Sequence, residues 1–175
     1  MPTNPYLSMV NQKLFFCNML LEQGLEKKIP ADLKPAYQLE IALCQSALYQ
    51  MESAYLNYLR EIAHTYQCKQ IELISSIKGL IAALNSIEKM PDEANEIASL
   101  TEDPLSWLSR LLFAYKALPL PSAVRGVTDR RQQSSSLLEV RQLDESVCLD
   151  YQLLQDWKKY FIEMVERHRE LMCEF

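Results

Sequence analysis

Apolar residues recur at steps of three and four along most of the chain, which is the period of an amphipathic helix. The longest such run covers residues 35–67 and has no glycine or proline in its interior. At 1.5 Å per residue, this helix would be roughly 50 Å long. Its apolar stripe consists of Tyr37, Ile41, Cys44, Leu48, Met51, Tyr55, Leu59, Ile62 and Tyr66.

Capping residues mark where two other helices begin. Asn4 followed by Pro5 is a start signal, because asparagine accepts backbone N–H bonds and proline fits the first helical turn. Asp103 followed by Pro104 is a second pair of this kind, and the helix that it opens runs to about residue 118. Both pairs therefore predict helices that start at the proline.

Three further elements follow from the spacing of apolar residues. We expect a helix over 70–87, a short helix after Pro91 and a last helix over 144–174. The helices over 35–67 and 144–174 are similar in length, so we expect them to be the main packing partners. The pattern predicts an all-α fold, an elongated bundle of four to five long amphipathic helices, in a single domain over residues 1–175.

The segment 119–143 departs from this pattern and is predicted to be an irregular basic loop. It contains prolines, a glycine and three consecutive serines, and its four arginines, one aspartate and one glutamate give it a net charge of +2. Irregular loops of this length are either functional or disordered. Arg125, Arg130 and Arg131 are therefore candidates for binding an anion, a nucleic acid or an acidic protein surface. The alternative is a solvated linker.

Composition excludes several classes of function. The chain has only three glycines, whereas phosphate-binding loops and dinucleotide turns need several glycines close together. Its net charge of −5 argues against a general nucleic-acid binder, because phosphate contacts require a basic face. Nucleic acid is therefore not favoured as a partner, and the segment 119–143 is the part of the chain that could bind it.

Cysteine usage and the lack of a long apolar run indicate where the chain works. The five cysteines form no Cys-x-x-Cys pair, and the N-terminal residues show no basic stretch followed by an apolar one. We therefore expect reduced thiols and a cytoplasmic location. No apolar run approaches the roughly 20 residues needed to cross a bilayer, so no membrane partner is expected.

The two histidines are the obvious places to look for a metal site. Glu61 and His64 are three residues apart on a predicted helix, which is the spacing of the iron-binding pairs in some helical bundles. Such a centre needs a second pair, and Val165 stands three positions before His168. We therefore expect no metal and no cofactor, with His64 at the edge of the apolar stripe and His168 at the edge of the core.

Arg60 and His64 raise a second chemical hypothesis. Helical ribonucleases of the HEPN type use an arginine and a histidine separated by four to six residues, whereas here only three residues intervene. This spacing weakens the hypothesis of general acid–base catalysis, so we expect no catalytic residues. A HEPN-like ribonuclease or nucleotide-handling bundle that uses Arg60 and His64 is the alternative.

Four stretches resemble an uncharacterised family of gammaproteobacterial, all-helical proteins that is classed as a domain of unknown function. They are NPYLSMVNQKLFF, ALCQSALYQMESAYLNYLREIAHTYQ, DPLSWLSRLLFAYKAL and LQDWKKYFIEMVERHRELMCEF, which together span most of the chain. The segment 119–143 is not part of this resemblance. Because the family has no assigned activity, the resemblance implies no catalytic residue.

These observations favour a non-catalytic protein that works by binding another protein, as an interaction or accessory module. The partner is an unknown protein or a second copy of the chain, since broad apolar stripes on 35–67 and 144–174 would leave a patch if they exceed what the core needs. A nucleic-acid accessory protein that binds through Arg125, Arg130 and Arg131 is a further alternative.

Overall fold

The computed structural model describes residues 4–26, 34–119 and 149–172. Within these ranges the chain forms α-helices and one short 3-10 turn, with no strand, so the all-α prediction is confirmed. The elements are α1 (Pro5–Glu26), α2 (Lys34–Thr65), η1 (Ile71–Leu73), α3 (Ile77–Asn85), α4 (Asp92–Glu102), α5 (Trp107–Ala117) and α6 (Tyr151–Met172).

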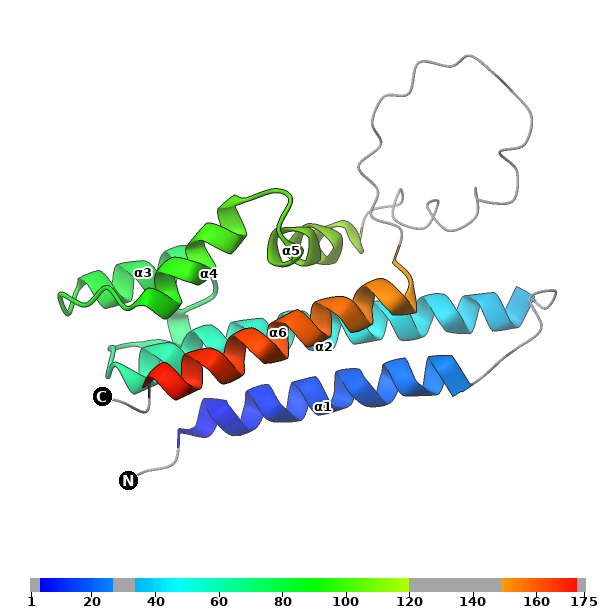
Figure 1. The fold of residues 1–175 in the computed structure, drawn as a ribbon, viewed down its shortest axis with the longest axis horizontal. Coiled ribbons are helices and arrows are strands. Elements are labelled where there is room, and N and C mark those ends of the chain that lie inside the picture. The colour runs from blue at the N-terminus through cyan, green and yellow to red at the C-terminus, as the bar shows by residue number, and fades with distance from the viewer. Residues whose placement is uncertain (1–3, 27–33, 120–148, 173–175) are drawn as a thin grey trace, which may run out of the picture.

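The helices lie in three tiers, which Figure 1 shows from one side. The long α2 and α6 form the middle tier, and α1 runs along one side of them. On the opposite side α3 and α4 pack together at one end, and α5 follows α4. α1 contacts α2 and α6 and has no described helix on its other side, so it is an edge helix.

The core lies between these tiers and is built mainly on α2. From α1, the side chains of Val10, Cys17 and Leu21 are fully buried. From α6, Trp157 and Phe161 are buried, and the ring of Trp107 on α5 lies 5.9 Å from that of Phe161. The α2 side chains in this core include Leu48, Met51, Tyr55, Tyr58, Leu59 and Ile62.

The main packing partner of α2 is α1, not the C-terminal helix that the matching lengths suggested. The short connection between Glu26 and Lys34 makes α1 and α2 an antiparallel hairpin, and such neighbours pack along their whole length. The described part of α6 begins at Tyr151 and crosses α2 more obliquely (Figure 1). Residues 144–148 of the predicted last helix lie outside the described residues.

The start of α1 agrees with the sequence signal. The helix begins at Pro5, and the backbone N–H of Tyr6 donates to Oδ1 of Asn4 over 3.1 Å. The Asn4 amide also donates to the carbonyl oxygen of Glu61 on α2, over 3.0 Å. Asn4 therefore caps its own helix and ties that end to α2.

The helix expected over 70–87 is shorter than predicted. α2 ends in a backbone motif in which the Cys68 N–H donates to the Ala63 carbonyl over 2.8 Å, and Gln67 takes a positive φ of 58°. This motif stops α2, and the chain passes through η1 before α3 begins at Ile77.

The helix expected to start at Pro104 begins at Trp107 instead. Ser106 is its N-cap, and the hydroxyl oxygen accepts from the N–H of Ser109 over 3.0 Å. Asp103 does accept a backbone bond, from Leu105 over 2.9 Å, but that bond closes a turn before the helix. The aspartate therefore caps a turn, and the serine caps the helix.

Candidate functional site

Arg60 and His64 make contacts with different parts of the chain. The Arg60 side chain is half-buried, and its Nε donates to the carbonyl oxygen of Ile74 over 3.1 Å. The half-buried ring of His64 lies edge-on to the ring of Tyr6 on α1, with the ring centroids 6.2 Å apart. Arg60 thus ties α2 to the segment before α3, while His64 packs toward α1.

Glu61, the third residue of that motif, faces α6 and pairs with Arg169. The Glu61 side chain is 2% exposed, and its two oxygens accept from Nε and Nη2 of Arg169 over 2.7 and 2.8 Å. Nη1 of Arg169 also donates to Oδ1 of Asn11 on α1, over 2.9 Å. This bidentate pair joins α1, α2 and α6 at one end of the bundle, and so Glu61 does not form a pair with His64.

A second set of polar side chains joins α2, α4 and α6 at the same end. The Tyr58 hydroxyl lies 2.8 Å from Nδ1 of His168, and Nε2 of His168 lies 2.9 Å from Oε2 of Glu96. Arg167 pairs with the other oxygen of Glu96. Burial is the main cause that raises the pKa of Tyr58, and the neighbouring Glu61 carboxylate raises it further. The hydroxyl therefore stays protonated and available as a donor.

Another carboxylate of α4 is held by a tyrosine of α2. Glu93 is 3% exposed, and the Tyr66 hydroxyl donates to its Oε2 over 3.3 Å. Partial burial, followed by the nearby carboxylate, raises the pKa of Tyr66 to about 12. We refer to Tyr58, Glu61, Tyr66, Glu93, Glu96, Arg167, His168 and Arg169 as the polar network.

The polar network joins helices and offers little to a substrate. Tyr58 and His168 are 0% and 1% exposed, and both ring nitrogens of His168 have partners. A solute cannot reach either group without opening the packing between α2, α4 and α6. Among the described residues, no three His, Cys, Asp or Glu side chains are arranged to hold a metal ion.

The candidate anion-binding residues cannot be placed. Arg125, Arg130 and Arg131 lie outside the described residues, as does nearly all of the segment 119–143. Their proposed role stays a prediction from sequence.

A groove of about 730 Å³ lies between α2 and the end of α5. Tyr49 and Tyr115 stand in its wall with their rings 5.3 Å apart, and their hydrogen bond is the main cause that raises the pKa of Tyr115 to about 12. Lys116 is the charged residue in the lining, and Pro119, where this described range ends, is at the rim. The lining of the groove thus combines aromatic and polar side chains, and the described range 34–119 ends at its rim.

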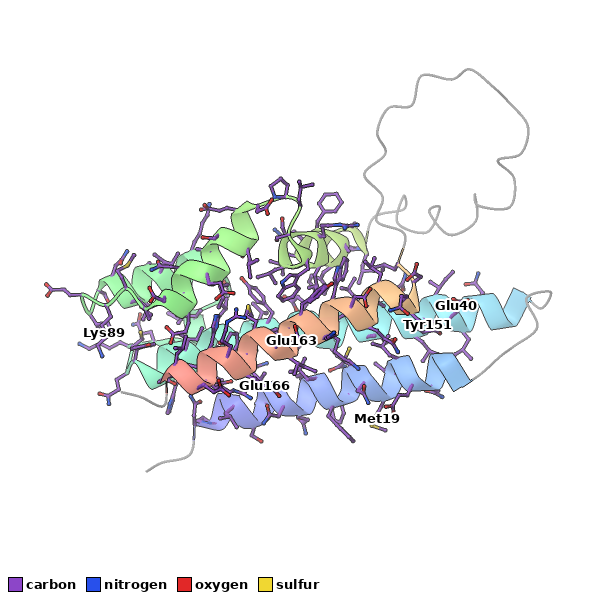
Figure 2. The ribbon with its side chains drawn as sticks, viewed as in Figure 1. Met19, Glu40, Lys89, Tyr151, Glu163 and Glu166 are labelled. Atoms are coloured by element: carbon purple, nitrogen blue, oxygen red, sulfur yellow. The ribbon has the colours of Figure 1, made fainter. Side chains whose placement is uncertain are left out.

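The largest group of exposed apolar side chains among the described residues is on α1. Phe15 is 60% exposed, Met19 52%, Met9 40% and Phe16 38%. At 100° per residue, these four occupy the side of α1 opposite its buried side. Figure 2 shows Met19 on the side of α1 that faces away from α6. We call Met9, Phe15, Phe16 and Met19 the outer α1 patch.

The largest exposed apolar group among the described residues is on a helix that the sequence pattern did not indicate. We expected excess apolar surface on α2 and α6, where Trp157 is buried but Tyr49, Tyr160 and Leu171 are 57%, 47% and 43% exposed. The sequence feature that could have located the patch is on α1, where Lys13 is the only charged residue between Pro5 and Leu21. A solvated helix of that length normally carries more charge.

The sequence pattern does indicate that the Glu61 side chain is buried. This residue follows Ala47, Ala54 and Tyr58 at steps of seven, four and three, so it continues a line of residues on one flank of α2. The structure buries all four. Its partner, Arg169, had no comparable signal.

Comparison with known proteins gives one match. The model for a family described as Family of unknown function (DUF6586) matches residues 5–175. No curated protein and no solved structure matches the chain. None of the described helices is both long enough and apolar enough to cross a lipid bilayer. With nearly its whole length matched, the chain belongs to the family of unknown function DUF6586.

Proposed function

We propose that this protein is a non-catalytic interaction module that binds a protein partner through the outer α1 patch. The observation that carries the proposal is the chemistry of that side of α1. The patch residues are apolar, and Ser8, Gln12 and Gln23, which share this side of α1, are exposed and uncharged, with the charged Glu22 at its edge.

The size of the patch supports a binding role. Fully exposed Phe and Met side chains present about 150–200 Å² each, so the exposed fractions leave on the order of 400 Å² of apolar surface in the patch. Contiguous apolar patches of this size on monomers are frequently functional. Covering 400 Å² would contribute about 10 kcal/mol before the entropic costs of association.

The chemistry of the polar groups supports binding over catalysis. The residues that could serve as acid or base, such as Glu61 and His168, are buried and fully engaged with partners on other helices. Arg60 and His64 each support the packing of a different segment. The part of α1 that faces solvent is therefore a better candidate for the working surface.

Site-specific photo-crosslinking in the source cell tests the proposal. A photoreactive amino acid replaces Phe15 in one variant and Glu163 of α6 in a matched control, since both side chains are more than half exposed. We expect a crosslinked protein adduct from position 15 and none from position 163. Equal yields at both positions, or no adduct at position 15, would contradict the proposal.

A further inference from the structure

We infer that the partner bound at the outer α1 patch is a second copy of this chain, placed by a two-fold axis that sets two α1 helices antiparallel. The inference rests on the proposed function and names its partner. In such a dimer each patch packs against the same patch of the other copy, so the surface has to be complementary to itself.

The charge distribution of α1 meets that condition. Among the eleven exposed residues of α1 whose side chains are described, Glu22 is the one charged residue. Lys13 is half-buried at the flank of the patch, where its Nζ lies 6.0 Å from the centroid of the Phe16 ring. A two-fold axis through the patch therefore brings no like charges into opposition, whereas like charges across an interface cost several kcal/mol.

The negative charge on other parts of the surface favours self-association through the outer side of α1. The chain has a net charge of −5, and two copies of an acidic protein repel each other where their acidic surfaces meet. Glu163 and Glu166, which Figure 2 labels on α6, are examples of such surface, together with Glu170. Contact through α1 keeps these carboxylates away from the interface.

The area is near the lower bound for a specific dimer. Two patches of on the order of 400 Å² would bury about 800 Å² of apolar surface, and the exposed amides of Gln12 and Gln23 would add to it. Specific interfaces bury at least about 1,000 Å² in total. The expected dimer is therefore a weak, reversible one.

The position of α1 in the fold allows the two copies to meet without rearrangement. α1 is an edge helix that already forms an antiparallel hairpin with α2, so a second α1 would extend the layer to α2–α1–α1–α2. With the axis between Cys17 and Asn18, Phe16 of one copy lies opposite Met19 of the other. Methionine side chains adapt to irregular gaps, so the two residue types can pack well.

A charge-exchange experiment tests the inference. We expect the mass of the full-length protein, measured by sedimentation equilibrium, to rise toward that of a dimer as the concentration reaches the high-micromolar range. The double variant Phe15→Glu, Met19→Glu and the double variant Phe15→Lys, Met19→Lys should each stay monomeric, and an equimolar mixture of the two should regain the dimer. In the matched control, Leu105→Glu with Phe113→Glu alters exposed apolar residues elsewhere and should dimerise like the unaltered chain.

The outcomes separate the inference from the proposed function. A monomeric unaltered chain, dimers of either α1 variant, or a variant mixture that stays monomeric would overturn the second-copy inference. Circular dichroism and thermal melting check that each variant folds, which is the expected result because both side chains are exposed. If the crosslinked adduct from position 15 then contains a different protein, the interaction module stands and only its partner changes. If there is no adduct, the proposed function fails as well.

Discussion

α1 and α6 are helices of equal length that both pack on α2, yet they present opposite surfaces to solvent. Each has 22 residues. Five of the eight exposed residues of α6 are charged, against one of the eleven on α1 whose side chains are described. Charge on the solvent side keeps a helix such as α6 hydrated. Its near absence on α1 is the observation on which the proposed binding surface rests.

The two helices also differ on their inner sides. α1 buries Val10, Cys17 and Leu21 in the hydrophobic core, and burial raises the pKa of the Cys17 thiol to about 12. α6 buries His168 and largely buries Arg169, whose hydrogen bonds have fixed directions. These polar bonds fix the register of α6 at its C-terminal end, whereas the fully buried side chains of α1 are apolar or thiol groups.

The largest expected effect comes from removing the buried cation of α6. Arg169→Met leaves the Glu61 carboxylate without its bidentate partner inside the bundle. Breaking a buried ion pair in this way costs about 3–5 kcal/mol. We expect the free energy of unfolding to fall by that amount in urea titrations followed by circular dichroism.

Arg167→Met is the matched control for that variant. Arg167 is the more exposed member of its pair with Glu96, with 54% and 39% of the two side chains exposed. Exposed pairs are worth about 0–1 kcal/mol, so this variant should stay close to the unaltered chain. Equal losses of unfolding free energy in the two variants would contradict the expected difference between the buried and the exposed ion pair.

A smaller loss is expected when His168 loses one of its two partners. Tyr58→Phe keeps the buried ring and removes the hydroxyl that lies 2.8 Å from Nδ1. An unpaired buried polar group costs about 1–3 kcal/mol. Tyr160→Phe on the outside of α6 should change stability little, because Tyr160 is 47% exposed. Urea titrations measure the free energy of unfolding of both variants. If Tyr58→Phe is as stable as the unaltered chain, the hydroxyl does not support His168 in the way described.

Alkaline pH should destabilise the fold through Tyr55 of α2. Burial raises the pKa of the Tyr55 hydroxyl from its ordinary value of about 10 to about 12. Between these pH values Tyr55 loses its proton in the unfolded chain and keeps it in the folded chain. Its contribution to the free energy of unfolding is therefore fully present below pH 10 and is lost as the pH rises toward 12.

Tyr55→Phe separates this contribution from the rest. We expect a shallower decline of the unfolding free energy above pH 10 in the variant, with a difference of about 1–2 kcal/mol by the upper end of the range. Below pH 10 the pH dependence of the two proteins should run parallel. Identical slopes in the alkaline range would show that Tyr55 ionises normally in the folded state.

The smallest effect on folding is expected at the outer α1 patch. Phe15→Gln with Met19→Gln replaces two residues that are more than half exposed, so the monomer loses little packing. Surface substitutions of this kind change stability by about 0.5 kcal/mol or less. Thermal melts at low concentration check this, and a large loss would mean that the patch belongs to the monomer core.

The course of α1 and most of α2 could be predicted from the sequence because local signals decide both. Asn4 and Pro5 start α1, and an unbroken apolar period defines α2. The end of α2 could not be predicted in this way. Helices commonly stop at a glycine with positive φ, but Gln67 takes that position here, and Glu88 does the same after α3 with a φ of 55°.

The candidate surfaces were harder to predict for a similar reason. A period shows which side of a helix is buried, and the stripe predicted for α2 is buried at Leu48, Met51, Leu59 and Ile62. It does not show whether apolar residues on the outer side of a helix, such as Phe15 on α1, contact anything. The pairing of Glu61 with Arg169 depends on how α2 and α6 cross, which no local pattern contains.

The most direct test of the account is a distance measurement between spin labels in the concentrated protein. A nitroxide label attached at Gln12→Cys, in the middle of the outer α1 patch, is compared with one at Glu163→Cys on α6, with the remaining reactive cysteines replaced by serine. If two copies associate through α1, the label on α1 shows a strong dipolar coupling between copies and the label on α6 shows none. No coupling at position 12, or equal coupling at both positions, would contradict that association.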